Sequence, residues 1–275
     1  MLSITTDYAR DKGNPEPYLR QIAEAGYTHI HWCHHWNTDF LYLPVEIEQI
    51  QHWLAALNLK LLDLHASDGS EKKWTSAREY ERLAGVELVR NRIDMAAALG
   101  GDAIVMHPPS SLDDMLERDP QWEPLRCSLD ALEPYARARS VRIALENTTL
   151  DSLRAIHRLF SQYSADYLGL CYDCGHGNLI DSGLDELDSL KDRLIAVHLH
   201  DNDGTGDQHN IPFTGSVDWE RLARIMAASS YTKCVSMESN MHRTGISDER
   251  EFLSKAFIAG TRLAAMIEHG RAAHD

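Results

Sequence analysis

Short apolar runs alternate with amphipathic helical stretches from one end of the chain to the other. Residues 15–26 show the helical part of this pattern, since Leu19, Ile22 and Ala23 share one helix face and Gly26 ends the helix. The apolar runs are rich in aliphatic and β-branched residues, and their alternation with helices is typical of parallel strands joined by crossover helices. The pattern predicts eight strands, at residues 2–6, 28–33, 60–65, 102–107, 141–146, 167–173, 194–200 and 233–238.

The helical segments and their ends support one continuous domain. In residues 78–101 the apolar positions form a broad stripe, and Gly100 and Gly101 end the helix just before the next strand. Asp218 and Asp248 stand at N-cap positions of two later helices. The predicted stripe consists of Leu83, Val86, Leu88, Val89, Ile93 and Ala97. Because no Pro-, Ser- or Gly-rich linker divides the chain, we expect residues 1–275 to form a single-domain (β/α)8 TIM barrel.

Composition narrows the classes of function. The chain has 275 residues, 43% of them hydrophobic, which suffices for the core of one large barrel. Its net charge of -15 and pI near 5.4 disfavour a nucleic-acid partner bound by a broad basic face. No apolar run approaches the ~20 residues that span a bilayer, so membrane insertion is not expected. Trp and Tyr side chains around residues 34–44 would suit a lid or a partner, including a second copy of the chain.

The cysteines indicate a reducing compartment. Their number, five, is odd, and they lack the regular spacing of a disulfide scaffold. No apolar signal segment opens the sequence, so we expect a cytoplasmic protein with reduced thiols. Cys171 and Cys174 have C-x-x-C spacing, but a zinc ribbon needs a second such pair and the sequence has none. We therefore treat this pair as incidental.

Six of the predicted strands end in potential metal ligands. One such residue could be the first solvated residue of a loop, but in a (β/α)8 barrel the reactive groups lie where the strands end. A carboxylate aimed into a barrel is costly unless a cation or a donor meets it. The strand-end residues are His65, His107, Glu146, Asp173, His198 with His200, and Glu238.

Two loops add further ligand types. Asp173 and His176 have D-x-x-H spacing just beyond a strand, and Gly177 allows a tight turn there. His198 and His200 alternate onto one strand face, and the residues that follow add Asp201, Asp203, Asp207 and His209. This density of imidazole and carboxylate groups predicts zinc or manganese rather than magnesium. His29, His31, His34 and His35 form a weaker group, and the flanking Trp32 and Trp36 suggest a substrate wall, so we assign them no metal.

These motifs resemble the xylose isomerase-like TIM barrel superfamily, which joins sugar isomerases and epimerases to apurinic endonuclease IV. The matching pieces are His65 and the motifs MHPP, LENT, YDCGH, VHLHDND followed by DQH, and MESN. In the isomerases and epimerases four strands hold one divalent ion. The resemblance places that ion on Glu146, Asp173, one of His198 or His200, and Glu238, and the sequence leaves the choice between the two histidines open.

The resemblance to endonuclease IV implies more than one ion. That enzyme holds three zinc ions, and its additional ligands look matched by His65, His107, His176, Asp207 and His209. We therefore expect one to three ions. The basic and aromatic loops with which the endonuclease penetrates DNA look absent, because the first loop, residues 7–17, is short and residues 34–44 contain no Arg or Lys.

Two reactions follow, and we favour the first. It is isomerisation or epimerisation of a sugar or sugar-like polyol, in which the ion stabilises an enediolate and Glu146 and Glu238 serve opposite faces of the substrate. The second is phosphoester hydrolysis at a zinc cluster, which would explain the surplus of ligands. The superfamily also resembles dehydratases and lyases, and a barrel that only binds a ligand is a third class. Whether the substrate carries a phosphate is left open.

Overall fold

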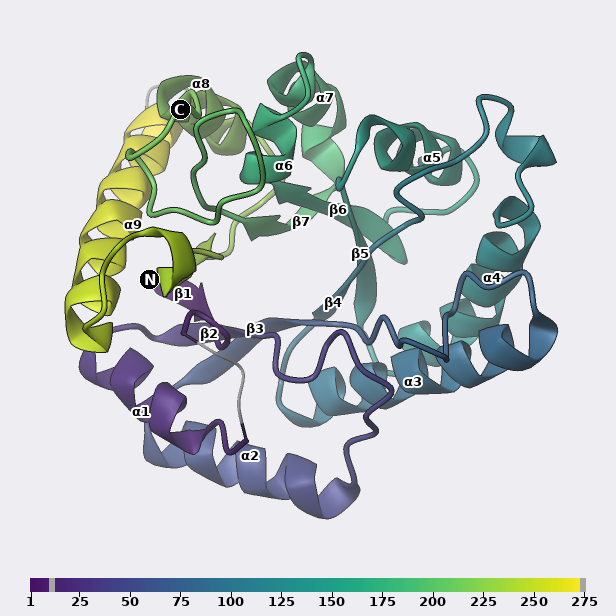
Figure 1. Cartoon of the computed structure of the whole chain (residues 1–275), viewed down its shortest axis with the longest axis horizontal. Helices are drawn as coiled ribbons and strands as arrows, with labels where there is room; N and C mark the ends of the chain where they lie inside the picture. Colours follow the sequence, from purple (N-terminus) through teal and green to yellow (C-terminus); the bar gives the residue numbers. More distant parts are fainter. Residues whose placement is uncertain (10–12, 273–275) are drawn as a thin grey trace.

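Eight parallel strands form the centre of the molecule in a computed structural model that describes residues 1–9 and 13–272 (Figure 1). The strands pair in the order β7-β6-β5-β4-β3-β2-β1-β8, so each is next to its neighbour in sequence apart from the junction of β1 and β8. The strands are β1 (Leu2–Thr5), β2 (His29–Trp32), β3 (Lys60–His65), β4 (Ala103–Met106), β5 (Arg142–Glu146), β6 (Leu168–Asp173), β7 (Leu194–His198) and β8 (Val235–Met237). The predicted strands are confirmed to within two residues at each end.

Backbone hydrogen bonds between β7 and β8 bring the sheet close to a full barrel. Leu199 donates its N–H to Ser236 O at 3.0 Å and accepts from Glu238 N at 3.1 Å. Beyond His198 the chain pairs through isolated bridges, Leu199 with Met237 and Asp201 with Asn210, rather than through a continuous ladder. The predicted strand 194–200 is therefore two residues too long.

Helices surround the barrel, as Figure 1 shows, with α9 beside α1 and α8. The helices are α1 (Glu16–Glu24), α2 (Pro44–Ala56), α3 (Glu79–Ala98), α4 (Trp122–Arg137), α5 (Leu150–Phe160), α6 (Cys174–Asn178), α7 (Gly183–Leu190), α8 (Trp219–Ala227) and α9 (Glu249–Ala272). The predicted caps are confirmed: Asp218 accepts from Arg221 N at 2.9 Å, and Asp248 accepts from Glu251 N at 2.8 Å. In the described part of the chain, no helix is long and apolar enough to cross a membrane.

The buried face of α3 differs from the stripe that its apolar residues predict. Leu83 is 50% exposed and Ala97 is also exposed, whereas Arg82 and Arg92 are buried. The helix turns Arg82, Val86, Val89 and Ile93 inward at i, i+4, i+7 and i+11, and Leu83 lies one residue, or about 100°, off that line. A buried guanidinium can occupy the stripe because it finds partners: Arg92 donates to Phe40 O at 3.1 Å and Arg82 to Ser128 Oγ at 3.2 Å.

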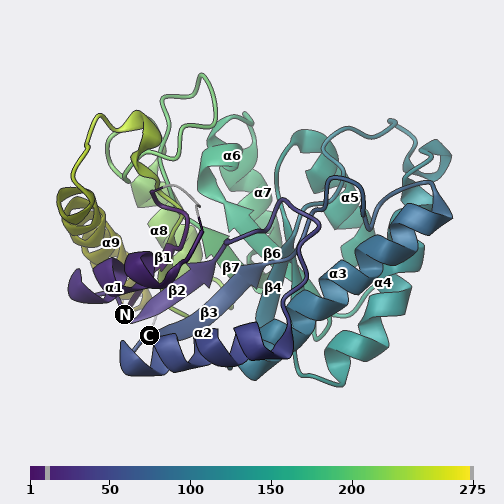
Figure 2. The same cartoon turned by 60° about the horizontal axis from the view of Figure 1, so that its bottom comes forward.

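The fold positions the site by separating an apolar end of the barrel interior from a polar one. A small cluster that includes Ala103, Val105, Ala144 and Ala196 fills part of the interior, while the larger core lies between strands and helices. Above the cluster, Glu146, Asp173 and His198 are fully or almost fully buried at the carboxyl ends of their strands. Figure 2 shows the connection between β7 and α8 rising above this end of the barrel.

Candidate metal centre at the carboxyl end of the barrel

The carboxyl ends of the strands surround a cavity of about 190 Å³. All ten side chains that the sequence predicts as metal ligands lie at or directly beneath it: His65, His107, Glu146, Asp173, His176, His198, His200, Asp207, His209 and Glu238. They come from segments far apart in the sequence, which the parallel strands bring to one end of the barrel. The structure therefore brings the predicted residues together, whereas their role as ligands stays a proposal.

The first group of these side chains lies on β3, β4 and β5. His65 Nε2 is 3.0 Å from His107 Nε2, and His107 Nε2 is 3.1 Å from Glu146 Oε2. His65 Nε2 lies 3.7 Å from the same carboxylate oxygen. Three ligand atoms within 4.8 Å of one another are close enough to share one ion.

The second group lies at the centre of the barrel and contains Glu146, Asp173, His198 and Glu238, whose ligand atoms are all within 4.8 Å of one another. His198 Nδ1 is 3.1 Å from Glu146 Oε2 and 3.3 Å from Glu238 Oε2, yet neither His198 nitrogen makes a hydrogen bond. A buried imidazole without partners is costly. These groups fit a divalent cation between them, because imidazole nitrogens and carboxylate oxygens are ligand atoms for such ions.

The third group surrounds Asp207. His209 Nε2 is 3.0 Å from Asp207 Oδ2 and His176 Nε2 is 3.5 Å from it, while His176 Nδ1 lies 3.3 Å from Glu146 Oε1. His200 Nε2 is 3.0 Å from Asp173 Oδ2, and His200 also forms a group with His209 and Glu238. Of the two histidines that the sequence could not separate, His198 belongs to the central group and His200 to this neighbouring one.

Local backbone geometry places two of these rings. A Cβ on Gly175 would clash with the His200 ring, so only glycine lets α6 pack this closely against it. His209 has a φ of 50°, which is unfavourable for a residue with a side chain. Its Nδ1 lies 2.8 Å from Glu238 O, and its carbonyl accepts from Asn240 N at 2.9 Å, contacts that hold this conformation. Gly177, in contrast, has no positive φ; it gives room to the Tyr172 hydroxyl.

The clustered charges shift the pKa values of the site in opposite directions. Burial raises the pKa of Glu146, but the rings of His198 and His107 outweigh burial and hold that pKa well below its usual range. Burial and the charges of Glu146 and Asp173 hold the pKa of Glu238 well above its usual range. Two neighbouring carboxyl groups therefore differ in proton affinity.

The pKa values of two histidines of the site also shift in opposite directions. Burial and the nearby His107 lower the pKa of His65 to about 3. Burial also lowers the pKa of His209, but its contact with Asp207 outweighs burial and raises that pKa to about 9.

The structure also shows what the sequence missed or assigned wrongly. Trp36 lines the cavity, with its ring 4.4 Å from that of His65, but Trp32 is buried and donates to Tyr42 Oη at 3.1 Å, so it is no substrate wall. Tyr42 is only 5% exposed, which removes it from the proposed lid or partner surface. Asp7 and Asn240 also line the cavity. Asp7 belongs to the first loop, of which residues 10–12 lie outside the described residues.

Asp201, which the sequence grouped with the potential ligands, has a structural role. It is fully buried and accepts hydrogen bonds from Trp219 Nε1 at 2.9 Å, Thr214 N at 3.1 Å and Val217 N at 3.2 Å. Asp203 is exposed and accepts from Thr205 and Gln208 within its own loop. These two carboxylates hold the loop that carries Asp207 and His209.

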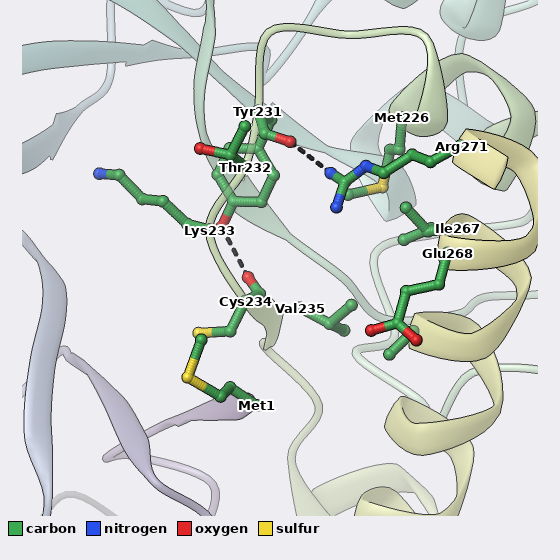
Figure 3. Close-up of a pocket in the computed structure, with 11 residues that line it drawn as sticks. Met1, Met226, Tyr231, Thr232, Lys233, Cys234, Val235, Ile267, Glu268 and Arg271 are labelled. Carbon is green, nitrogen blue, oxygen red and sulfur yellow. Dashed lines mark hydrogen bonds between the residues drawn. The ribbon is translucent and has the colours of Figure 1, made fainter. Parts of the chain in front are cut away.

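A cavity at the opposite end of the barrel offers a contrast (Figure 3). It measures about 110 Å³ and lies between the start of β8 and α9, where Arg271 donates to Tyr231 O at 2.5 Å. Of the described residues that line it, only Glu268 carries a carboxylate and none is a histidine. The ligand types therefore gather at the carboxyl end of the barrel.

Comparison with known proteins agrees with this architecture. The profile of the xylose isomerase-like TIM barrel family matches residues 19–256. The uncharacterized protein y4fM of Sinorhizobium fredii is 35% identical to the chain, covering 92% of this chain and 89% of that protein. A probable endonuclease 4 of Mycobacterium ulcerans is 27% identical over 59% of this chain and 68% of its own length.

Solved structures share the fold at low sequence identity. A D-tagatose 3-epimerase-like protein superposes with a TM-score of 0.79 at 18% identity, covering 100% of this chain and 99% of the other. An L-ribulose 3-epimerase superposes with a TM-score of 0.77 at 17% identity, covering 99% and 96%. The fold is a (β/α)8 barrel, and histidine and carboxylate side chains cluster at the carboxyl ends of its strands. The chain belongs to the xylose isomerase-like TIM barrel family.

Proposed function

We propose that the protein is a divalent-metal-dependent isomerase or epimerase of a sugar or sugar-like polyol. The observation that carries this proposal is the pair Glu146 and Glu238, whose carboxylates approach one His198 nitrogen at 3.1 and 3.3 Å from nonadjacent strands. Two carboxylates beside one ion can remove and return a carbon-bound proton on opposite faces of a substrate. The solved epimerases that share the fold support this choice by analogy.

The residues around the cavity suit an uncharged polyol. Trp36 offers an apolar ring face, and Asp7 and Asn240 offer hydrogen-bonding groups. None of the described residues that line this cavity is Arg or Lys. Glu146, Asp173, His198 and Glu238 would hold the ion, which when bound would polarise the substrate carbonyl. Glu146 and Glu238 would then move the proton at the neighbouring carbon.

Substitution of either glutamate tests the proposal. The protein loaded with zinc or manganese is incubated with ketopentoses and ketohexoses in D2O. Product formation is measured together with deuterium incorporation at the carbon next to the carbonyl group. Glu146→Gln and Glu238→Gln should each lower turnover by about 10²- to 10⁴-fold, since they remove a general acid or base. Glu268→Gln, at the opposite end of the barrel, is the matched control and should leave turnover unchanged. Full activity of Glu146→Gln on a confirmed substrate would exclude this role.

A second candidate is phosphoester hydrolysis at a cluster of ions. It is favoured by Glu146, which belongs both to the central group and to the group with His65 and His107. A carboxylate between two ligand groups can bridge two ions, which together would activate water and hold the leaving oxygen. This candidate predicts about three zinc ions per chain by elemental analysis and cleavage of a duplex with an abasic site. One bound ion, or no cleavage at full metal content, would contradict it.

A further inference from the structure

A second histidine–carboxylate pair lies inside the barrel below the central group. His31 on β2 and Asp63 on β3 are both fully buried, and His31 Nδ1 is 2.7 Å from Asp63 Oδ1. Both side chains are inside the barrel because they alternate with outward-facing neighbours, as His65 does two residues after Asp63. Asp63 therefore fixes the His31 ring with a hydrogen bond at Nδ1 and leaves Nε2 free.

The free nitrogen of His31 has no partner among the described residues. His31 Nε2 is buried and makes no hydrogen bond, and the same is true of both nitrogens of His198. The two rings lie with their centroids 4.5 Å apart. Ligand atoms of His31, His198 and Glu238 are all within 4.8 Å of one another, a spacing that a single ion can bridge.

His31, with one ring nitrogen on a carboxylate and the other without a partner, is arranged as metal-binding histidines usually are. Metal-binding histidines almost always donate their second ring N–H to a carboxylate or carbonyl, which orients the ring and makes the free nitrogen a better donor. A buried imidazole nitrogen without a hydrogen-bonding partner is unfavourable, so it is expected where a bound group contacts it. Hydrogen bonding explains the orientation of His31, but it leaves Nε2 unexplained.

We propose that His31, oriented by Asp63, is a metal ligand that shares an ion with His198 and Glu238 inside the barrel. The proposal rests on the metal site of the proposed function and adds one histidine ligand to it, since His198 and Glu238 also belong to the central group. It also gives a reason for a charged residue in the barrel interior, since Asp63 would act through His31 as a positioning residue. His31 would hold the ion without contacting the sugar.

Metal affinity and metal spectroscopy test this proposal independently of any sugar. Apo protein is titrated with Zn²⁺ against a chromophoric chelator, and the visible absorption of the Co²⁺ form is recorded. His31→Gln should weaken the binding of one ion by about 100-fold and change the Co²⁺ spectrum, and Asp63→Asn should weaken it by about 10-fold. His52→Gln is the control, since His52 is exposed on α2 and its Nδ1 contacts Glu48 O at 2.7 Å, away from the groups of the site. It should bind metal as the wild type does.

Folding controls and metal binding together separate the failure of this proposal from the failure of the proposed function. Far-UV circular dichroism and thermal unfolding in chelator establish that each variant folds; if His31→Gln does not, Asp63→Asn carries the test, because Asn keeps the shape of the side chain. Unchanged affinity and an unchanged Co²⁺ spectrum in the folded variants would overturn the proposal and leave the metal site standing. Wild-type protein that binds no ion would overturn this proposal and the proposed function together.

Discussion

Thermal stability should depend steeply on the free concentration of Zn²⁺ or Mn²⁺. The site buries His198 and His200 with ring nitrogens that lack hydrogen bonds, and an ion would supply their partners. An ion that binds only the folded chain stabilises it by about 4.1 kcal/mol at 1,000 times its dissociation constant. Chelation removes this contribution.

The size of the effect follows from the length of the chain. An unfolding entropy of about 2.1 cal/mol/K per residue gives about 0.6 kcal/mol/K for this protein. Stabilisation by 4.1 kcal/mol then raises Tm by about 7 °C. Each further tenfold of free metal adds about 1.4 kcal/mol per bound ion, or about 2.4 °C. A protein that binds three equivalent ions would show about 7 °C per decade, so the slope separates one ion from a cluster.

Differential scanning calorimetry in metal buffers measures this slope. Trp36, whose ring centroid lies 4.4 Å from that of His65, offers fluorescence as a second probe. The Glu146→Gln variant should have a smaller slope, because Glu146 belongs to more than one ligand group. A wild-type Tm that is the same in chelator and at saturating metal would refute the inference that these side chains bind an ion.

Three further predictions concern charged groups of the site and of its loop. The pKa values of Glu238 and His209 are raised, the latter to about 9, so metal binding should displace protons from these two side chains and metal affinity should rise with pH. Calorimetry at pH 7 in buffers of different ionisation enthalpy should detect the released protons, and the release of no protons would contradict these pKa shifts. In chelator, the contribution of His209 to stability is complete below its unfolded pKa of 6.5 and is lost as pH rises through about 9, so Tm should fall over that range. Asp201→Asn turns an amide N–H₂ toward donors such as Trp219 Nε1 and should cost about 3 kcal/mol, or about 5 °C in Tm, while folded protein keeps its metal content. Loss of metal without loss of stability would contradict the structural role of Asp201.

Local pattern was sufficient for the strands and for most of the site. Strand residues alternate between two faces, and parallel strands in a barrel end at the same side, so His65, Glu146 and Asp173 could be placed together without coordinates. The same rule applied to β2 and β3 would have indicated His31 and Asp63. Alternation places both side chains inside the barrel, but their hydrogen bond joins two strands and is contained in neither strand's pattern.

The amino-acid sequence by itself determined the eight-stranded barrel and the end of it where the potential ligands lie, because the hydrophobic period and the succession of strands and helices along the chain are local properties. Tertiary structure decided which of His198 and His200 joins Glu146, since two residues on one strand face differ only in their depth along the barrel. It also decided that Trp32 is buried while Trp36 lines the cavity, and that α3 buries Arg82 rather than Leu83. Those outcomes depend on partners distant in sequence, which no local pattern contains.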